Sequence, residues 1–369
     1  MNLRNIVPAL ALAAFTAAPA MAADAAPAVS FEGWVDTILT FTSDDIKDDV
    51  GATEKDEEAA TIRFSSVASL KANWKVTDAL AARVNLWFQS ETAEVWMREA
   101  YFAWALNDTV TWSMGKYINT VGWIAAEPTG LYTVNDSNIG YLDIYGNDVI
   151  GTSIAVAPKG SRFSGSFHIT NGYFTPSDAF NGAPSDSREN TDLGFGLDLT
   201  YKFGDKGNVN LDLVYDMHSD KGTADMGGDV FLVGLNATVM PIKPLTIGAE
   251  VMYQMVDDSD PSPAGGDAVD ILQFMLMGNY AIEGASIPMS VTGMIQYMQI
   301  DSDAAADAEG RLGVTAALLT NPLGSSNFGL NFEIGYWDVT DNSTDDVFDS
   351  AFGPDATGFV VSVEGLVTF

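Results

Sequence analysis

Hydrophobic and polar residues alternate along most of the chain beyond its N-terminal region. Between residues 62 and 76, one set of alternate positions is almost entirely apolar, whereas the other carries serine, asparagine, lysine and arginine. A period of two places the two sets on opposite faces of a β-sheet. No window of comparable length shows the 3.6-residue period of an amphipathic helix. The pattern therefore predicts an all-β protein.

The alternating segments predict sixteen strands in up-and-down order. They cover residues 29–42, 61–74, 80–90, 94–106, 109–117, 147–157, 162–171, 192–204, 208–218, 229–240, 244–256, 269–282, 287–300, 310–320, 327–339 and 356–369. Longer acidic segments follow the odd-numbered strands, and tight turns rich in Gly, Pro, Asn and Asp follow the even-numbered ones. This is the layout of a transmembrane antiparallel β-barrel. A soluble β-sandwich is less favoured, because sandwiches rarely hold so many strands in one such order.

The first 22 residues have the pattern of a secretory signal peptide. A basic residue and a short apolar run precede Ala20-Met21-Ala22, which matches the A-x-A cleavage pattern. No later stretch approaches the roughly 20 apolar residues of a transmembrane helix. We therefore predict a signal peptide over residues 1–22 and a single exported β-barrel over residues 23–369.

The composition excludes several classes of protein. The chain carries 50 acidic residues against 17 Lys and Arg, for a net charge of −33, and it has no cysteine. Nucleic-acid binding needs a clustered cationic surface, so a nucleic-acid partner is excluded. Disulfides and thiolate metal sites are excluded as well. Most of the carboxylates fall in the predicted external loops, so the negative charge is expected on one rim of the barrel.

Catalysis has little support in the sequence. His168 shares one face of a predicted strand with Ser164 and Ser166, but the sequence shows no acidic residue nearby to orient it. We therefore predict that the chain is not an enzyme. A structural surface barrel without transport is another alternative, although the chain shows neither a periplasmic domain nor a repeat array.

Two segments carry a resemblance to a known family. Residues 358–369 alternate and end on Phe369, and so resemble the closing strand of bacterial outer-membrane proteins. Together with the signal peptide and the strand count, the chain resembles a Gram-negative porin, which implies a bacterial outer-membrane location, lipid contacts and a homotrimer. Arg98-Glu99-Ala100-Tyr101, followed by Met114-Gly115-Lys116, is similar to a segment of the phosphate-selective porins and their relatives.

The third loop is the candidate for a pore constriction. Residues 117–147 form a connection of roughly thirty residues, where loops usually stay under about 12–15. In general porins the third loop folds into the barrel and narrows it. The acidic candidates in this segment are Glu127, Asp136 and Asp143, and it holds no Lys or Arg. Two alternatives remain: a loop packed on the external rim, and a hidden strand pair over 131–134 and 141–145 that would give eighteen strands.

A cluster of basic residues on neighbouring strands could oppose this loop. Its members are Arg63, Lys71, Arg83 and Arg98. The first three lie on the polar register and are expected to face the lumen, whereas Arg98 shares the parity of lipid-facing positions and would be a rim residue. A basic wall facing acidic loop residues would set up a transverse field that selects ions. The alternative is a set of scattered charges that only keep the wall wet.

These features predict a water-filled channel for passive diffusion of small hydrophilic solutes and ions, weakly selective for cations. A channel specific for sugar or phosphate is the alternative; Trp87, Tyr101 and Tyr117 would favour sugar. No cofactor is expected, except that Ca²⁺ or Mg²⁺ could bridge carboxylates of the external loops. The candidate ligands are Asp44, Asp45, Asp341 and Asp345.

Overall fold

The structure is a computed structural model. It describes residues 28–48, 55–90, 93–124, 127–135, 139, 145, 148–174, 193–217, 229–257, 268–302, 309–324, 327–340 and 356–369. The predicted signal peptide, residues 1–22, lies outside these residues.

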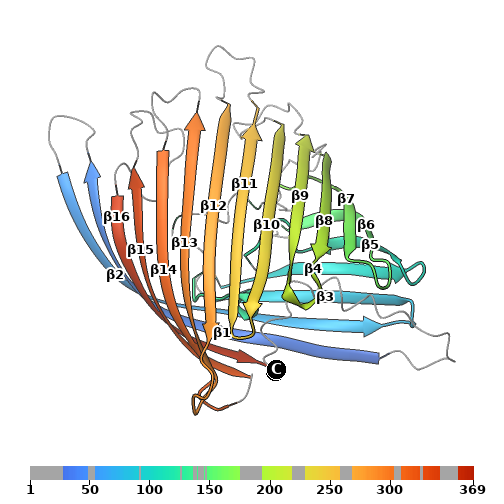
Figure 1. Ribbon diagram of the computed structural model, residues 1–369, viewed down its shortest axis with the longest axis horizontal. Coiled ribbons are helices and arrows are strands. Elements are labelled where there is room, and N and C mark those ends of the chain that lie inside the picture. The colour runs from blue at the N-terminus through green and yellow to red at the C-terminus, as the bar shows by residue number, and fades with distance from the viewer. Residues whose placement is uncertain are drawn as a thin grey trace.

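Sixteen antiparallel strands form one closed barrel, as predicted (Figure 1). They are β1 (Ala28–Asp48), β2 (Lys55–Lys75), β3 (Leu80–Gln89), β4 (Glu94–Ala105), β5 (Val110–Tyr117), β6 (Val149–Val156), β7 (Phe163–Thr170), β8 (Leu193–Lys202), β9 (Gly207–Met217), β10 (Val230–Ile242), β11 (Leu245–Val256), β12 (Val269–Ala281), β13 (Met289–Ser302), β14 (Glu309–Thr320), β15 (Phe328–Thr340) and β16 (Ala356–Thr368). Each strand pairs with its sequence neighbours, and β1 pairs with β16. Closure pairs the two edge strands, so the sheet presents no open edge to lipid.

Two short 3-10 turns accompany the strands: η2 (Pro128–Gly130) and η5 (Gly204–Lys206). Residues 131–134 are not a strand, so the eighteen-strand alternative is wrong. Among the described residues, no helix is long and apolar enough to cross a membrane.

The first hairpin is longer than predicted. β1 and β2 continue pairing to Asp48 opposite Lys55, well beyond the predicted boundaries at residues 42 and 61. The added residues are mostly charged or small, which is why the sequence pattern predicts a loop there. A strand that rises beyond the lipid has water on both sides, so its sequence no longer needs an apolar face.

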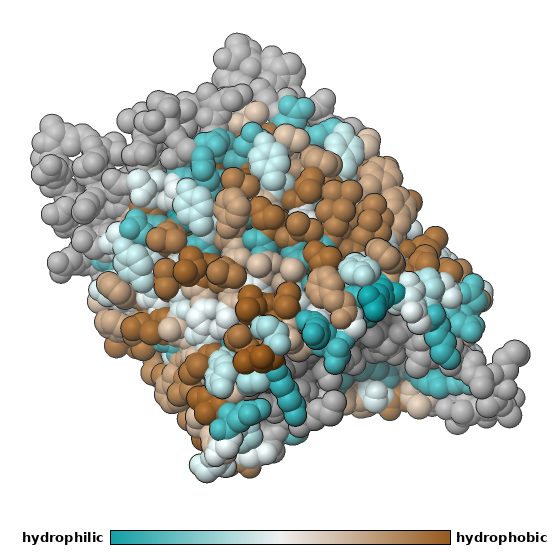
Figure 2. All heavy atoms as spheres, viewed as in Figure 1, coloured by the Kyte–Doolittle hydropathy of each residue, from teal (hydrophilic) through white to brown (hydrophobic). Residues whose placement is uncertain are grey.

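The outward face of the barrel is apolar. Large hydrophobic side chains with high exposure occupy alternate positions around the wall, among them Ile62, Phe64, Ile154, Phe274 and Ile334. Figure 2 shows hydrophobic residues covering much of the visible side of the barrel, with hydrophilic residues gathered near its ends. This is the surface expected of a wall that contacts lipid chains.

The inward face differs from the uniformly polar lining that the alternation predicts. On β11–β13 it carries buried methionines: Met252, Met275, Met277, Met294 and Met298. These side chains form one apolar cluster with residues of the third loop, including Val121, Ile124 and Ile139. The prediction failed here because an inward position can be covered by a loop instead of by water.

Candidate pore lining and constriction

The described part of the third loop reaches across the lumen to the far wall. The Trp123 backbone N–H donates to Glu250 Oε2 of β11 at 2.5 Å, and its indole N–H donates to Thr238 Oγ1 of β10 at 2.8 Å. The indole lies directly over Gly248, where an added Cβ would come within 2.4 Å of the ring. Tyr132 stacks on Trp123 at a centroid distance of 5.5 Å. The loop is therefore held between the barrel walls.

Residues further along the loop bind β14 and β15. The backbone N–H groups of Val134 and Asn135 donate to Glu333 Oε2 at 2.6 and 3.2 Å. The Arg311 guanidinium donates to the Ile139 carbonyl oxygen at 3.3 Å. Wall side chains thus supply acceptors and donors to a loop backbone that has no sheet partner.

The loop carboxylate Glu127 pairs directly with the predicted basic wall. Lys71 Nζ on β2 lies 2.5 Å from Glu127 Oε2, and the Asn85 amide of β3 donates to Glu127 Oε1 at 3.3 Å. Both members of the ion pair are mostly buried. The two charges are in contact and do not face each other across open water.

Two further members of the basic wall lie on the lumen-facing registers of β2 and β3. Arg83 donates to Asn73 Oδ1 at 2.7 Å, and its guanidinium lies 3.4 Å from Glu32 and 3.8 Å from Glu99. Arg63 is exposed and lies opposite Thr40 of β1.

Arg98 faces the lumen, so its predicted rim position is wrong. The register of β3 and β4 shifts here: Asn85 lies opposite Glu99, but Leu86 lies opposite Met97. Arg98 is therefore the extra residue of a β-bulge, and both it and Glu99 turn inward. Its guanidinium stacks over the Trp87 ring at 3.8 Å, and its Nε lies 3.3 Å from Asp148 Oδ1.

The bulge also explains the motif that includes Arg98. Tyr101 lies opposite Gly115, whose φ is 134°, and a Cβ at Gly115 would come within 2.2 Å of the Ala100 carbonyl oxygen. Glycine is therefore required there. Lys116 is buried and interacts electrostatically with Asp148 and Arg98. The motif builds a charged cluster in which the two cations share Asp148.

The remaining candidates are placed as follows. Asp136, Asp143, Asp341 and Asp345 lie outside the described residues. Asp44 and Asp45 lie within β1, opposite Ala59 and Glu58 of β2, and not in the first loop where the sequence predicted them. In the described part of the chain, no group of three or more His, Asp or Glu is arranged to hold a metal ion.

His168 has the acidic partner that the sequence did not reveal. Asp198 lies on the neighbouring strand β8, with its Oδ2 2.9 Å from His168 Nε2, and Ser166 Oγ lies 2.9 Å from the same nitrogen. Tyr117 hydrogen-bonds Nδ1. In a serine-hydrolase triad the carboxylate binds Nδ1 and the serine binds Nε2. Here both groups share one nitrogen, so the triad geometry is not formed.

Water reaches the lumen unevenly. The inward side chains of β12–β16 are almost all buried. On β2–β4, the inward residues Ser69, Asn85 and Glu99 are buried too, but six other inward side chains are exposed or half-buried: Arg63, Arg83, Trp87, Trp96, Arg98 and Tyr101. Part of the accessible lumen surface therefore lies along the β2–β4 wall, where the basic candidates lie.

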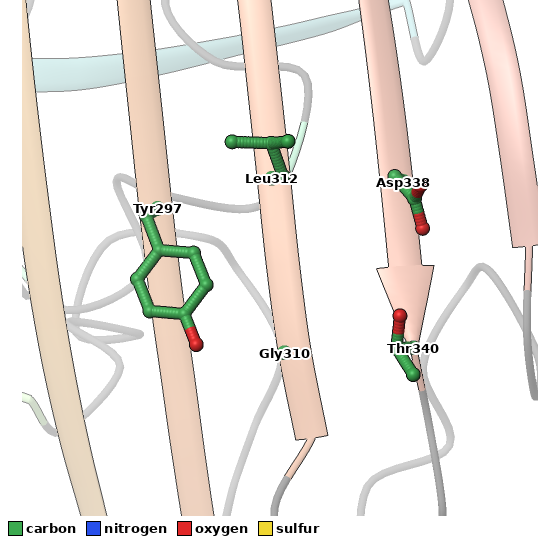
Figure 3. A pocket seen from close by; sticks show the side chains of 5 residues that line it. All are labelled: Tyr297, Gly310, Leu312, Asp338 and Thr340. Atoms are coloured by element: carbon green, nitrogen blue, oxygen red, sulfur yellow. The ribbon is translucent and has the colours of Figure 1, made fainter.

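A shallow pocket on the barrel lies elsewhere. It is lined by Tyr297, Gly310, Leu312, Asp338 and Thr340 of β13–β15 (Figure 3). Tyr297 and Leu312 belong to the outward, exposed set. This pocket is a feature of the outer surface and not part of the channel.

Comparison with known proteins identifies the fold. OmpT, an outer-membrane protein of Vibrio cholerae, matches with a TM-score of 0.60 at 16% identity over 95% of this chain and 100% of its own. The outer-membrane channel DcaP of Acinetobacter baumannii gives 0.63 at 12% identity, over 94% and 99%. The chain has the fold of outer-membrane porins. An anion-selective porin from Comamonas acidovorans gives 0.58 at 13%, over 93% and 100%. No protein-family model and no curated protein sequence matches the chain.

Proposed function

We propose that the protein is a bacterial outer-membrane porin that lets small hydrophilic solutes and ions diffuse passively, with a weak preference for cations. The porin-like barrel has an apolar exterior, and charged side chains follow the accessible wall of its lumen. A wide closed barrel with such an interior is suited to an aqueous channel.

The proposed cation preference rests on the balance of charged side chains in the lumen. Among the described residues, inward carboxylates outnumber inward cations: Asp36, Glu99, Asp198, Asp212, Asp216, Glu250, Glu333 and Glu364, with Glu127 and Asp148 of the loop, against Arg63, Lys71, Arg83, Arg98, Lys116 and Arg311. A net negative lumen raises the local concentration of cations. The Comamonas porin is described as anion-selective, so selectivity on this fold must follow the side chains.

Reversal potentials in a KCl gradient across a planar bilayer test this proposal. We expect cation preference in the native channel, and a weaker preference in E127Q because Lys71 loses its partner. E283Q makes the same chemical change at an exposed turn and serves as the control. A chloride preference, or an equal effect of both variants, would contradict the selectivity, and the absence of any conductance would contradict the channel.

A specific phosphate channel is less well supported. It would need inward cations free to bind an anion, whereas Lys71, Arg83 and Arg98 each lie within 4 Å of a carboxylate. We also propose a homotrimer, since one of the similar OmpT structures is described as a trimer form. We also propose that divalent cations bind the external carboxylates. Measuring the thermal stability of the protein at increasing calcium concentrations would test this.

A further inference from the structure

The hollow on the outer face of the barrel has no part in the channel. Tyr297 of β13 forms one flank, Asp338 and Thr340 of β15 form the other, and Leu312 and Gly310 of β14 form the floor between them (Figure 3). Gly310 keeps the floor open: an added Cβ would lie 3.7 Å from the Tyr297 hydroxyl oxygen, which is an ordinary contact. With a volume of about 340 Å³ and flanks about 10 Å apart, the hollow can take a small polar group.

The hollow lies at the level where a lipid bilayer meets water. Gly310 is the second residue of β14 and Thr340 is the last of β15, so both lie at the loop ends of their strands. Toward the tight turns, the next outward positions are the exposed apolar residues Ile295 and Val314. Toward the loops, Asp301 of β13 is exposed. Tyrosines at such a boundary lie among lipid head groups, and the longer loops of such barrels are extracellular. The hollow therefore faces the head groups of the outer leaflet.

The outer face around the hollow is negatively charged. Asp338 is half-buried, and the Tyr336 hydroxyl donates to its Oδ2 at 3.0 Å, which holds the carboxylate at the flank. Within β12–β16, Arg311 is the only Lys or Arg. Its side chain is buried on the inward face, where it pairs with Glu309. The outer face of these five strands therefore presents carboxylates and no cation.

The polar groups of the hollow match a primary ammonium. Such a group carries one positive charge and three N–H donors. The Asp338 carboxylate and the hydroxyl oxygens of Tyr297 and Thr340 supply three acceptors around one hollow. A phosphate would meet the carboxylate and find no cation, whereas an ammonium forms a charge-assisted hydrogen bond with it. Leu312 and Val314 give the acyl chains of a lipid an apolar surface below the head group.

We propose that this hollow binds a lipid whose head group carries a primary ammonium, and so fixes that lipid against the outer wall. The ammonium donates to Asp338, Tyr297 and Thr340, and the acyl chains lie along β13 and β14 toward the membrane centre. A pocket with an apolar floor and a few placed polar groups is the usual composition of a small-molecule site. The site needs the barrel to lie in a membrane, but it does not depend on conduction through the lumen.

Native mass spectrometry of the detergent-solubilised protein with dioctanoyl phosphatidylethanolamine tests the site. We expect one lipid to bind saturably. Dioctanoyl phosphatidylcholine has the same charges but no N–H on its nitrogen, and dioctanoyl phosphatidylglycerol has no ammonium, so both should bind roughly tenfold more weakly. D338N should raise the half-saturating concentration of phosphatidylethanolamine roughly tenfold, because a hydrogen bond between two charged groups is lost. G310L should weaken binding too, since its side chain fills the hollow while Asp338 stays in place.

D301N is the matched control, because Asp301 is an exposed carboxylate near the same end of β13 but does not line the hollow. It should leave the binding unchanged. Equal binding of the three lipids, a preference for phosphatidylglycerol, or equal effects of D338N and D301N would overturn the site. So would the absence of saturable binding, as expected if a second copy of the chain covers the hollow. Each of these outcomes leaves the ion conductance of the channel intact, whereas a barrel that conducts no ions would overturn the proposed function.

Discussion

At the scale of single residues, burial and pairing determine what each lumen charge contributes. Asp148, at the end of the third loop, is half-buried beside Arg98 and near Lys116. Burial raises the pKa of Asp148 above its ordinary value, although both cations act in the opposite direction. This carboxyl therefore takes up a proton at a higher pH than an exposed aspartate does.

The raised pKa of Asp148 predicts an early loss of cation preference on acidification. As the pH falls, Asp148 becomes neutral before ordinary carboxylates do, and the charges of Arg98 and Lys116 are then less compensated. As the pH rises through this range, the carboxylate ionises and the preference returns. The D148N channel should already prefer cations less at neutral pH. Its reversal potential should not change in the higher pH range in which Asp148 of the native channel takes up its proton. Parallel curves for D148N and the native channel would contradict this assignment, and D108N at an exposed turn is the control.

At the scale of elements, glycines in the wall receive aromatic rings of the loops. Gly248 on β11 lies beneath Trp123, and Gly196 on β8 lies beneath Tyr173. The loop backbone next to each ring is bound by a wall carboxylate: Glu250 for Trp123 and Asp216 for Tyr173. At both places, an inward glycine makes room for an aromatic ring of a loop, and a nearby inward carboxylate binds the loop backbone.

The contact between Gly248 and Trp123 predicts that G248A loosens the third loop. The added Cβ would lie 2.4–2.8 Å from the indole, so the ring must move. We expect a larger and more variable single-channel conductance. G278A on the adjacent strand is the control, because a Cβ there meets no atom within 4 Å. Unchanged conductance in G248A would show that the indole does not hold the loop.

The sequence predicted the strands better than the loop contacts for a physical reason. Lipid on one face imposes alternation on each strand separately, so the pattern is local and can be counted. The bulge at Arg98 depends on the register between β3 and β4, and the Asp198–His168 contact depends on the register between β7 and β8. The methionines of β11–β13 appeared as ordinary inward positions, because the loop that covers them lies more than a hundred residues away in sequence. A local sequence pattern shows neither how two strands are paired nor which loop packs over a given position.

At the scale of the whole molecule, the barrel depends on joining its two ends. Gly33 of β1 and Phe369 exchange two backbone hydrogen bonds, each 3.0 Å long. The Phe369 ring lies over Gly33, where an added Cβ would come within 2.7 Å of the ring. The last residue therefore covers the first strand at the point where the sheet closes.

This contact predicts that F369A weakens closure without breaking the backbone pairing. Truncation removes the ring from Gly33 but keeps both hydrogen bonds, so we expect a loss of roughly 1 kcal/mol in stability. The loss should appear as a lower temperature for the shift from the folded to the unfolded band in gel electrophoresis. F163A is the control: Phe163 is also exposed on the outer face and packs on Tyr201 at 4.7 Å, but it lies away from the seam between β1 and β16. We expect F369A to lower that temperature more than F163A does, because only Phe369 packs at the seam. Equal shifts would mean that the Phe369 ring stabilises the barrel no more than another exposed ring on the outer face.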